Sequence, residues 1–265
     1  MEIPALSITR AMTLLFAAFS FARITVAAAD SQENPNEKQA YLGAGPYMQS
    51  QPYEGADAFT VATPVVFFDN RRFYMRWMRL GMYLYGEQNW GISITAQPVP
   101  LQYEASDSRA LAGMEDRDNS WEAGFAISGE NDLGFAELSL FHDLLGNSNG
   151  TKLRLELGKT LKSGRWTLVP SVLVIGLSDS FNDYYYGVRD SEATPTRPAY
   201  SAGSGINLAA QTYLMYDITP RWHILGNIRA DYLSSEITDS PIVDQDWMLS
   251  GMISVLYSFP ITVRQ

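Results

Sequence analysis

Only two histidines, His142 and His223, are available for acid–base catalysis in this chain of 265 residues. Ser139 lies three residues before His142 and Asp143 directly follows it, so the residue types of a Ser–His–carboxylate hydrolase occur together. Positions three apart on a strand face opposite sides, so His142 cannot activate Ser139 within one strand. A partner from another strand remains open; otherwise we expect no catalytic residue.

Two acidic clusters could hold a metal ion or work as an acid–base pair. Glu115, Asp116 and Asp118 form one, and Asp179 and Asp183 form the other. A glycosidase needs two carboxylates at a fixed separation around a sugar-sized cleft, and calcium takes several carboxylate oxygens. Both clusters lie among turn-forming residues, and neither belongs to an Asp-x-Asp-x-Asp-Gly loop. We therefore expect solvated acidic loops, with no metal site and no cofactor.

Three adjacent tyrosines followed by Gly-Val, at residues 184–188, form the most unusual local run. Tyrosines on a loop make good contact surfaces because they bury area at a low cost in conformational entropy. They could instead fold the loop back over the molecule or extend the preceding strand. We favour the structural role, and we expect residues 240–243 of the last long loop to pack against them.

Short strands separated by turn residues would position these side chains. From Trp222 to Tyr232, apolar residues alternate with polar ones that include Arg229 and Asp231, and this period of two is typical of a strand. Charged residues on the second face suit a polar lumen better than a packed soluble core. The eleven predicted segments are 41–47, 59–68, 73–85, 90–103, 121–128, 133–141, 153–161, 166–177, 206–216, 222–233 and 247–259.

The last segment, from Trp247 to Phe259, has one continuous apolar and aromatic face. A tilted strand of about 9–11 residues crosses a bilayer as part of a β-barrel. Short turns alternate with long polar connections along the chain, and aromatic residues gather near strand ends, as in transmembrane barrels. Such barrels usually have an even number of strands, so we split 73–85 near residues 78–81. The prediction is an all-β, antiparallel up-and-down transmembrane barrel of about twelve strands, with ten as the alternative.

The amino-terminal residues indicate export. An apolar run at 11–21 and three alanines at 27–29 precede Asp30, which matches a secretory signal peptide cleaved after Ala29. A membrane anchor is the competing interpretation, but the run is shorter than the ~20 residues of a spanning helix. We expect a signal peptide at 1–29, a short periplasmic segment at 30–39, the barrel at 40–259 and a tail at 260–265.

Composition excludes several classes of protein. The chain has no cysteine, which excludes disulfides, thiolate metal sites and cysteine nucleophiles. Its net charge is −10, and nucleic-acid binding instead requires clustered Lys and Arg. After the leader, no stretch of ~18 apolar residues occurs, so a helical membrane protein is excluded.

Several spaced motifs resemble the MipA/OmpV family of outer-membrane proteins. They are Leu111–Arg117 with Glu122–Gly124, the tyrosine run with Glu192, Arg197-Pro-Ala-Tyr200, Asp239-Ser-Pro-Ile-Val243 and the final Tyr257-Ser-Phe259. The resemblance covers roughly residues 41–259, and the six residues after Phe259 depart from it, because the aromatic normally ends the chain in this family. The interaction candidates it marks are Tyr184, Tyr185, Tyr186, Gly187, Val188, Arg197, Pro198, Tyr200, Ser240, Pro241 and Val243, with Tyr257 and Phe259 as the terminal-strand signal.

The resemblance implies a non-catalytic barrel in the outer membrane. One family member is described as a scaffold that joins a lytic transglycosylase to a murein synthase, so both enzymes are expected partners. Lipid, lipopolysaccharide and the barrel-assembly machinery are the others. A narrow channel or a surface receptor or adhesin is the alternative, and an enzyme acting on lipid comes third.

Overall fold

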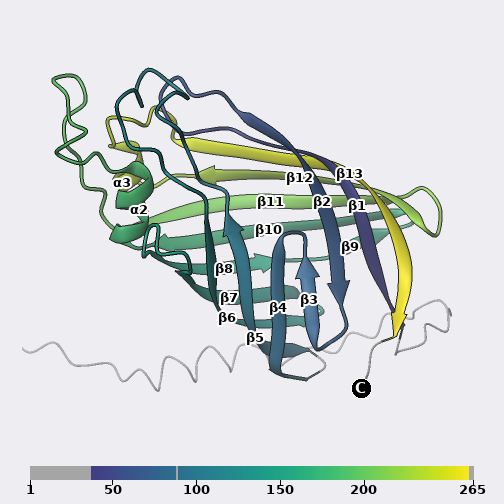
Figure 1. Ribbon diagram of the computed structural model, residues 1–265. Helices are drawn as coiled ribbons and strands as arrows, with labels where there is room; N and C mark the ends of the chain where they lie inside the picture. Colours follow the sequence, from purple (N-terminus) through teal and green to yellow (C-terminus); the bar gives the residue numbers. More distant parts are fainter. Residues whose placement is uncertain (1–36, 88, 263–265) are drawn as a thin grey trace, which may run out of the picture. The chain divides into compact units, whose positions relative to one another are not determined.

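The computed structural model describes residues 37–87 and 89–262, and most of them belong to one antiparallel sheet (Figure 1). The strands are β1 (Glu37–Gln49), β2 (Phe59–Asp69), β3 (Phe73–Arg76), β4 (Arg79–Gly86), β5 (Trp90–Val99), β6 (Ser120–Asn131), β7 (Gly134–Asp143), β8 (Thr151–Gly158), β9 (Leu161–Ser163), β10 (Trp166–Leu177), β11 (Gly205–Asp217), β12 (Trp222–Tyr232) and β13 (Trp247–Thr262). Two helices, α2 (Asp179–Tyr186) and α3 (Ser235–Thr238), lie in connections. No helix in this part of the chain is long and apolar enough to cross a membrane. The predicted signal peptide lies outside the described residues.

The sheet is a closed barrel of twelve strands. β8 and β9 lie in line, because both pair with β10 and the Lys159 amide between them donates to the Pro170 carbonyl at 3.1 Å. β1 pairs with β13, and each other strand pairs with its sequence neighbours, so the ring closes. The predicted count of twelve is confirmed over the alternative of ten.

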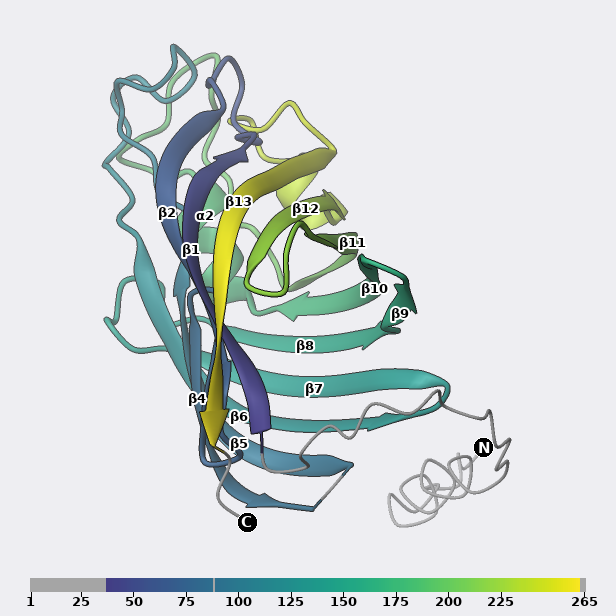
Figure 2. The ribbon, with the colours of Figure 1, turned by 90° about the vertical axis from the view of Figure 1, so that its right-hand side faces the viewer.

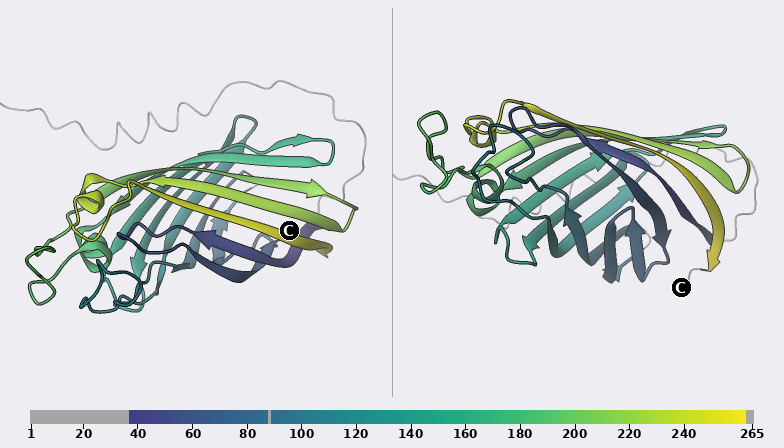
Figure 3. Two further views of the ribbon diagram at one scale, coloured as in Figure 1. Left: turned by 90° about the horizontal axis from the view of Figure 1, so that it is seen from above. Right: turned by 45° about the horizontal axis from the view of Figure 1, so that its top comes forward.

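The twelfth strand comes from splitting residues 73–85, as the even-number rule required. β3 and β4 form a hairpin that turns at Trp77 and Met78, where Trp77 has a φ of 57°. This hairpin is short: β3 has four residues, and only Phe67–Asp69 of the longer β2 pair with it. Figure 1 and the right-hand view of Figure 3 show that the hairpin reaches only part of the way along β2.

Alternate side chains of each strand point to lipid or to the lumen. On β13, Leu249, Ile253 and Val255 are exposed on the outer face, whereas Met252 and Leu256 are buried inside. Exposed apolar side chains of this kind cover the outside of the barrel, and such a surface is stable only against lipid. The predicted alternation of the last strand is therefore confirmed, with its apolar face outward.

The two ends of the barrel differ. Short turns join β2 to β3, β4 to β5, β6 to β7, β9 to β10 and β11 to β12 at one end. The long connections and both helices gather at the other end (Figure 1, Figure 3). Outward aromatic pairs stand near the turn end, as with Trp166 and Tyr216 at 4.5 Å, and near the loop end, as with Tyr232 and Trp247 at 4.9 Å. Not every aromatic residue near a strand end follows this pattern, because Tyr47 and Phe141 point inward and are buried.

The seam between β1 and β13 runs past the predicted bounds of 40–259 (Figure 2). Glu37 pairs with Thr262 and Gln39 with Pro260, so part of the predicted tail is strand. The Ser258 amide donates to the carbonyl of Arg221, which directly precedes β12. Pro260, two residues further on, turns its backbone to the same side, where β12 no longer extends, so a proline is tolerated there. The proline nitrogen therefore removes no hydrogen bond between the strands.

Candidate functional site

A cavity of about 1500 Å³ occupies the lumen. Its lining includes turn residues at one end, such as Glu87 and Asn89, and reaches Phe181 and Tyr186 at the other. The lumen is therefore a continuous space along the barrel rather than a filled core. Its wall divides into a charged side and an apolar side.

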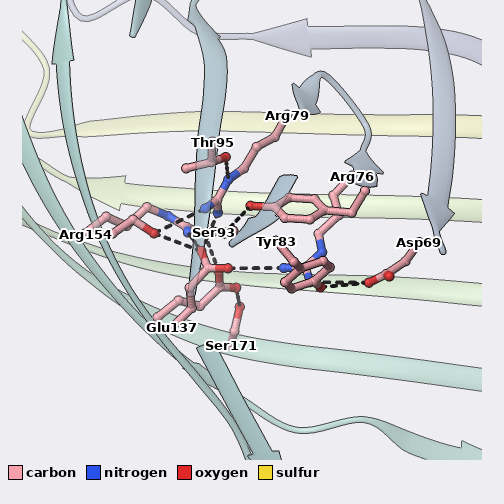
Figure 4. Close-up of polar contacts among 12 residues, drawn as sticks. Asp69, Arg76, Arg79, Tyr83, Ser93, Thr95, Glu137, Arg154 and Ser171 are labelled. Atoms are coloured by element: carbon pink, nitrogen blue, oxygen red, sulfur yellow. Dashed lines mark hydrogen bonds and ion pairs between the residues drawn. The ribbon is translucent and has the colours of Figure 1, made fainter. Parts of the chain in front are cut away.

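The charged side is organised around Glu137 of β7 (Figure 4). Arg76 Nη1 lies 3.1 Å from Glu137 Oε2, Arg154 Nη1 lies 3.0 Å from Oε1, and Arg79 also donates to Oε1. The Glu137 side chain is only 6% exposed, so these arginines replace its hydration. Three guanidinium groups from β3, β4 and β8 are thereby joined through one carboxylate.

Further contacts balance the charge of this network. Arg154 also pairs with Glu156, which accepts hydrogen bonds from Ser171 Oγ and Gln211 Nε2, both at 2.7 Å. Asp69 lies 3.9 Å from Arg76. The three arginines thus face three carboxylates, those of Asp69, Glu137 and Glu156. The network ties seven strands together, and its six charged groups carry no net charge.

The apolar side, named for its hydrophobic cluster, lies across the lumen on β1, β2, β12 and β13. It also carries the inward Arg229–Asp231 ion pair of β12, as the sequence predicted. Tyr47, Val65, Leu225, Met252 and Leu256 form a buried cluster there. The Tyr47 ring lies 4.9 Å from Trp77 and 6.0 Å from Phe59. This side offers aromatic and aliphatic surface to any molecule inside the barrel.

The long loops fold into the outer end of the lumen and form a cap. The largest buried cluster combines loop residues with inward side chains of β5, β10 and β11, such as Leu173 and Ile175. Within the cap, Arg117 and Glu192 are each 2% exposed and lie 3.0 Å apart. Burial opposes ionisation of Glu192, but amide hydrogen bonds from Arg189 and Glu115 and the Arg117 guanidinium outweigh it, so the pKa lies below its usual range.

The tyrosine run belongs to this cap. Tyr185 and Tyr186 are buried, and the Tyr53 hydroxyl donates to the Tyr185 carbonyl at 3.2 Å. The run ends a helix, which the sequence analysis did not predict. Ser178 caps α2 by accepting the Phe181 amide, and Asp179 supplies a negative charge in its first turn.

The other motif residues surround the same run. Ser240 Oγ donates to the Tyr186 carbonyl at 2.6 Å, Val243 bridges to Tyr53, and Pro241 lies beside them, half-buried. The Ser240–Tyr186 hydrogen bond is a contact of the kind expected between residues 240–243 and the tyrosine run, whereas Val243 pairs with Tyr53 outside the run. Val188 bridges to Tyr200, whose hydroxyl donates to the Glu236 carbonyl at 3.0 Å.

Gly187 and Arg197 have specific structural roles. The Gly187 amide caps the end of α2 by donating to the Asp183 carbonyl at 2.9 Å, and a Cβ on Gly187 would clash with that carbonyl oxygen. Arg197 donates to the carbonyls of Ala110, Ala112 and Glu192 and so joins two loops, while Pro198 is exposed.

The candidate catalytic and metal-binding residues are not brought together. His142 is exposed on the outside and bonds to Thr151 at 3.1 Å, whereas Ser139 points inward to Glu137. In the acidic clusters, Asp116 accepts the Ala105 amide and Asp183 accepts the Ala202 amide. Within residues 37–87 and 89–262, no group of three His, Cys, Asp or Glu side chains could hold a metal ion.

His223 has partners that sequence spacing did not reveal. Its Nδ1 lies 2.6 Å from Asp217 Oδ1 and its Nε2 lies 2.9 Å from Ser258 Oγ. This is the order of an Asp–His–Ser triad. Ser258 is 2% exposed, and none of the three residues lines the lumen cavity. The arrangement therefore joins the β11–β12 turn to β13.

A closed barrel with a lipid-facing apolar surface, short turns at one end and long loops at the other defines an outer-membrane β-barrel protein. The family model of MltA-interacting protein MipA matches residues 42–259. The chain belongs to this family and is an outer-membrane protein, as the sequence motifs implied.

Three relatives support this assignment. MltA-interacting protein of Escherichia coli (strain K12) is 30% identical over 82% of this chain and 89% of its own length. Putative outer membrane protein YiaT of the same strain is 29% identical over 82% of this chain and 90% of its own. Outer membrane protein OmpV of Vibrio cholerae is 30% identical over 63% of this chain and 65% of its own. Their names refer to an interaction or to the outer membrane.

Glu137→Gln tests the charged network. The substitution leaves three arginines around a neutral amide, so we expect the barrel to lose roughly 3 kcal/mol of stability. The measurement is urea unfolding of the protein in detergent micelles. Glu130→Gln, at the exposed end of β6, is the control and should leave the midpoint unchanged. Equal midpoints for both variants would show that the network does not hold the strands together.

The low pKa of Glu192 predicts an acid-sensitive cap. A carboxyl whose pKa is lowered by folding stabilises the folded form above its unfolded pKa of about 4.3, and the stabilisation is lost as pH falls through the folded value. Amide protection of residues 178–204, corrected for intrinsic exchange, should therefore decrease as the medium is acidified below about pH 4.3. In Glu192→Gln, protection should be weak at neutral pH and change little with acid.

Proposed function

We propose that this protein is a non-catalytic outer-membrane scaffold that binds a lytic transglycosylase on its periplasmic face and brings it to a murein synthase. The observation that carries the proposal is the 30% identity, over most of both chains, with a protein named for its interaction with MltA. The candidate chemistry agrees with a non-catalytic role, because His142 and Ser139 point to opposite sides of the wall.

The charge distribution suggests where a partner binds. Although the chain has a net charge of −10, exposed basic side chains gather at the short turns, which face the periplasm in outer-membrane barrels. They are Arg71, Arg72, Lys159, Lys162, Arg165 and Arg221. We call this set the basic rim. The acidic residues concentrate in the long loops at the opposite end.

The basic rim supplies the docking surface that short turns alone would lack. Charged side chains at the edge of an interface steer association and set orientation more than they add affinity. A partner with an acidic surface would therefore be held at the periplasmic end of the barrel. The carbonyl of Arg165 accepts the Asp217 amide, which fixes two neighbouring turns of the rim relative to each other.

Reversal of rim charges tests this scaffold role. Lys159→Glu, Lys162→Glu and Arg165→Glu together should lower transglycosylase recovery about tenfold, because three surface pairs at about 0.5 kcal/mol each sum to about 1.5 kcal/mol. The measurement is photo-crosslinking in intact cells from benzoylphenylalanine placed at Ile218, which is 42% exposed in the neighbouring turn.

Arg109→Glu, an exposed change in a long loop, is the matched control and should leave recovery unchanged. Equal recovery from the triple variant and the control would contradict docking at the basic rim. Recovery of barrel-assembly factors alone, from the native protein, would contradict the scaffold role itself.

A narrow channel is the second candidate, and the lumen cavity of about 1500 Å³ favours it. The cap closes the outer end, so conductance in planar bilayers should be small. Tyr185→Ala removes a fully buried cap side chain and should raise conductance, whereas Leu145→Ala, at an exposed loop position, should not. Equal conductance for all three proteins would argue against passage through the cap.

A further inference from the structure

The wall of the barrel is incomplete beyond the tip of the β3–β4 hairpin. The last bond on one side joins the Trp77 amide to the Val66 carbonyl at 2.8 Å. β2 continues to Phe59, and within the described chain no strand pairs with that stretch on the β3 side. On the other side, β4 pairs with β5 only as far as Ala96. We call the opening bounded by residues 59–65, 76–79 and 97–101 the wall gap.

Prolines stand on both free edges of the wall gap. Val66 presents its backbone to the hairpin, so the alternate residue Pro64 faces the same side, where the hairpin has ended. On β5, the backbone groups of every second residue from Trp90 onward point toward β4. Pro98 is one of these residues, and it lies where β4 has ended, so its backbone faces the wall gap. Proline has no N–H to offer to another strand and is confined to edges of this kind. The two strands are therefore built to remain unpaired here.

The free edge of β2 lies at the level of the bilayer. Through β1, residues 59–66 are in register with residues 250–257 of β13. Ile253 and Val255 within that stretch belong to the lipid-facing surface. The outward side chains of the edge itself, Thr60 and Ala62, are small and exposed. A lipid chain can therefore approach the edge closely.

The lower border of the wall gap is anchored. Arg76 and Arg79, on either side of the turn, both bind Glu137, and Tyr74 bonds to Ser93 at 3.0 Å. On the β2 side, Trp77 Nε1 donates to Thr63 Oγ1 at 3.1 Å. The hairpin is thus held on both flanks, and the opening beyond it is a defined feature of the wall.

The lumen cavity extends to all borders of the wall gap. Its lining includes Val61 on β2, Met78 at the hairpin tip, and Pro98 and Leu101 opposite. Val61 is opposite inward-facing Tyr47 on β1, so its side chain also points inward, and it is 47% exposed. In hydrocarbon, unpaired backbone groups are tolerated only where they line a water-filled space. The lumen supplies that space, so lumen and bilayer meet at this opening.

We propose that the wall gap admits the hydrocarbon chain of a membrane lipid from the bilayer into the lumen. Apolar side chains line the entry, and the aromatic surface of Tyr47, Phe59 and Trp77 lies directly inside it. The arginine network beyond is balanced by carboxylates, so it offers polar contacts without selecting the charge of a head group. The proposal is independent of the scaffold function.

Single cysteines test the wall gap, because the natural chain has none. The three variants are Val61→Cys at the gap, Ser128→Cys in the lumen near the turn end and Leu249→Cys on the lipid face. Each is folded into phosphatidylcholine vesicles and treated with N-dodecylmaleimide, whose alkyl chain confines it to the bilayer. A small water-soluble maleimide, added separately, reports folding and access from the lumen.

We expect N-dodecylmaleimide to label Val61→Cys at nearly the rate of Leu249→Cys and at least about tenfold faster than Ser128→Cys, because bilayer binding concentrates the probe at lipid-accessible sites. The water-soluble reagent should label both lumen cysteines. If the alkyl reagent labels Val61→Cys as slowly as Ser128→Cys, lipid chains do not enter and the proposal is overturned. Equal rapid labelling of both would show entry through the barrel ends, which also overturns it.

Discussion

The requirement that governs this structure is that backbone polar groups facing lipid must find partners within the protein. It explains why β1 meets β13, why each of the twelve strands is paired on both sides along at least part of its length and why irregular backbone is kept to the ends. The same requirement makes the edge of β2 informative. A free edge is stable there only because the lumen behind it can supply water, so the cavity and the opening depend on each other.

The division of the lumen into two sides follows from this arrangement. Inward side chains of the central strands carry paired charges: Glu137 joins three arginines, and Asp69 and Glu156 balance the remaining positive charge. Inward side chains near the seam include the apolar and aromatic cluster around Tyr47, together with polar residues such as Gln49 and the Arg229–Asp231 ion pair of β12. The charged side fixes the short hairpin, while the apolar side receives the indole of Trp77 from its tip. The cap closes the outer end. The lumen can therefore exchange molecules with its surroundings only at the periplasmic end and, as we propose, through the wall gap.

The features predicted correctly from the sequence are those that repeat. A period of two over residues 247–259 identifies the outward face of the last strand, and the even-number rule places the split within 73–85. Contacts between distant positions carry no such signal. Glu137 and Arg79 are 58 residues apart, and each resembles any inward polar residue of a barrel strand. Asp217, His223 and Ser258 meet only because β11, β12 and β13 are neighbours. Helix α2 was missed because its eight residues, about two turns, are too few to show a helical period.

The truncated hairpin also changes how the barrel responds to force. At the periplasmic end every strand is bonded on both sides, so that end behaves as a closed hoop whose diameter cannot change without breaking hydrogen bonds. Beyond the hairpin tip the cross-section is an open arc, with β2 at one end of it and β5 at the other. The two ends of the arc can move apart or together while all ladder bonds stay intact. Lateral pressure in the membrane can therefore change the width of the outer half of the barrel elastically. Only the loops of the cap resist that change.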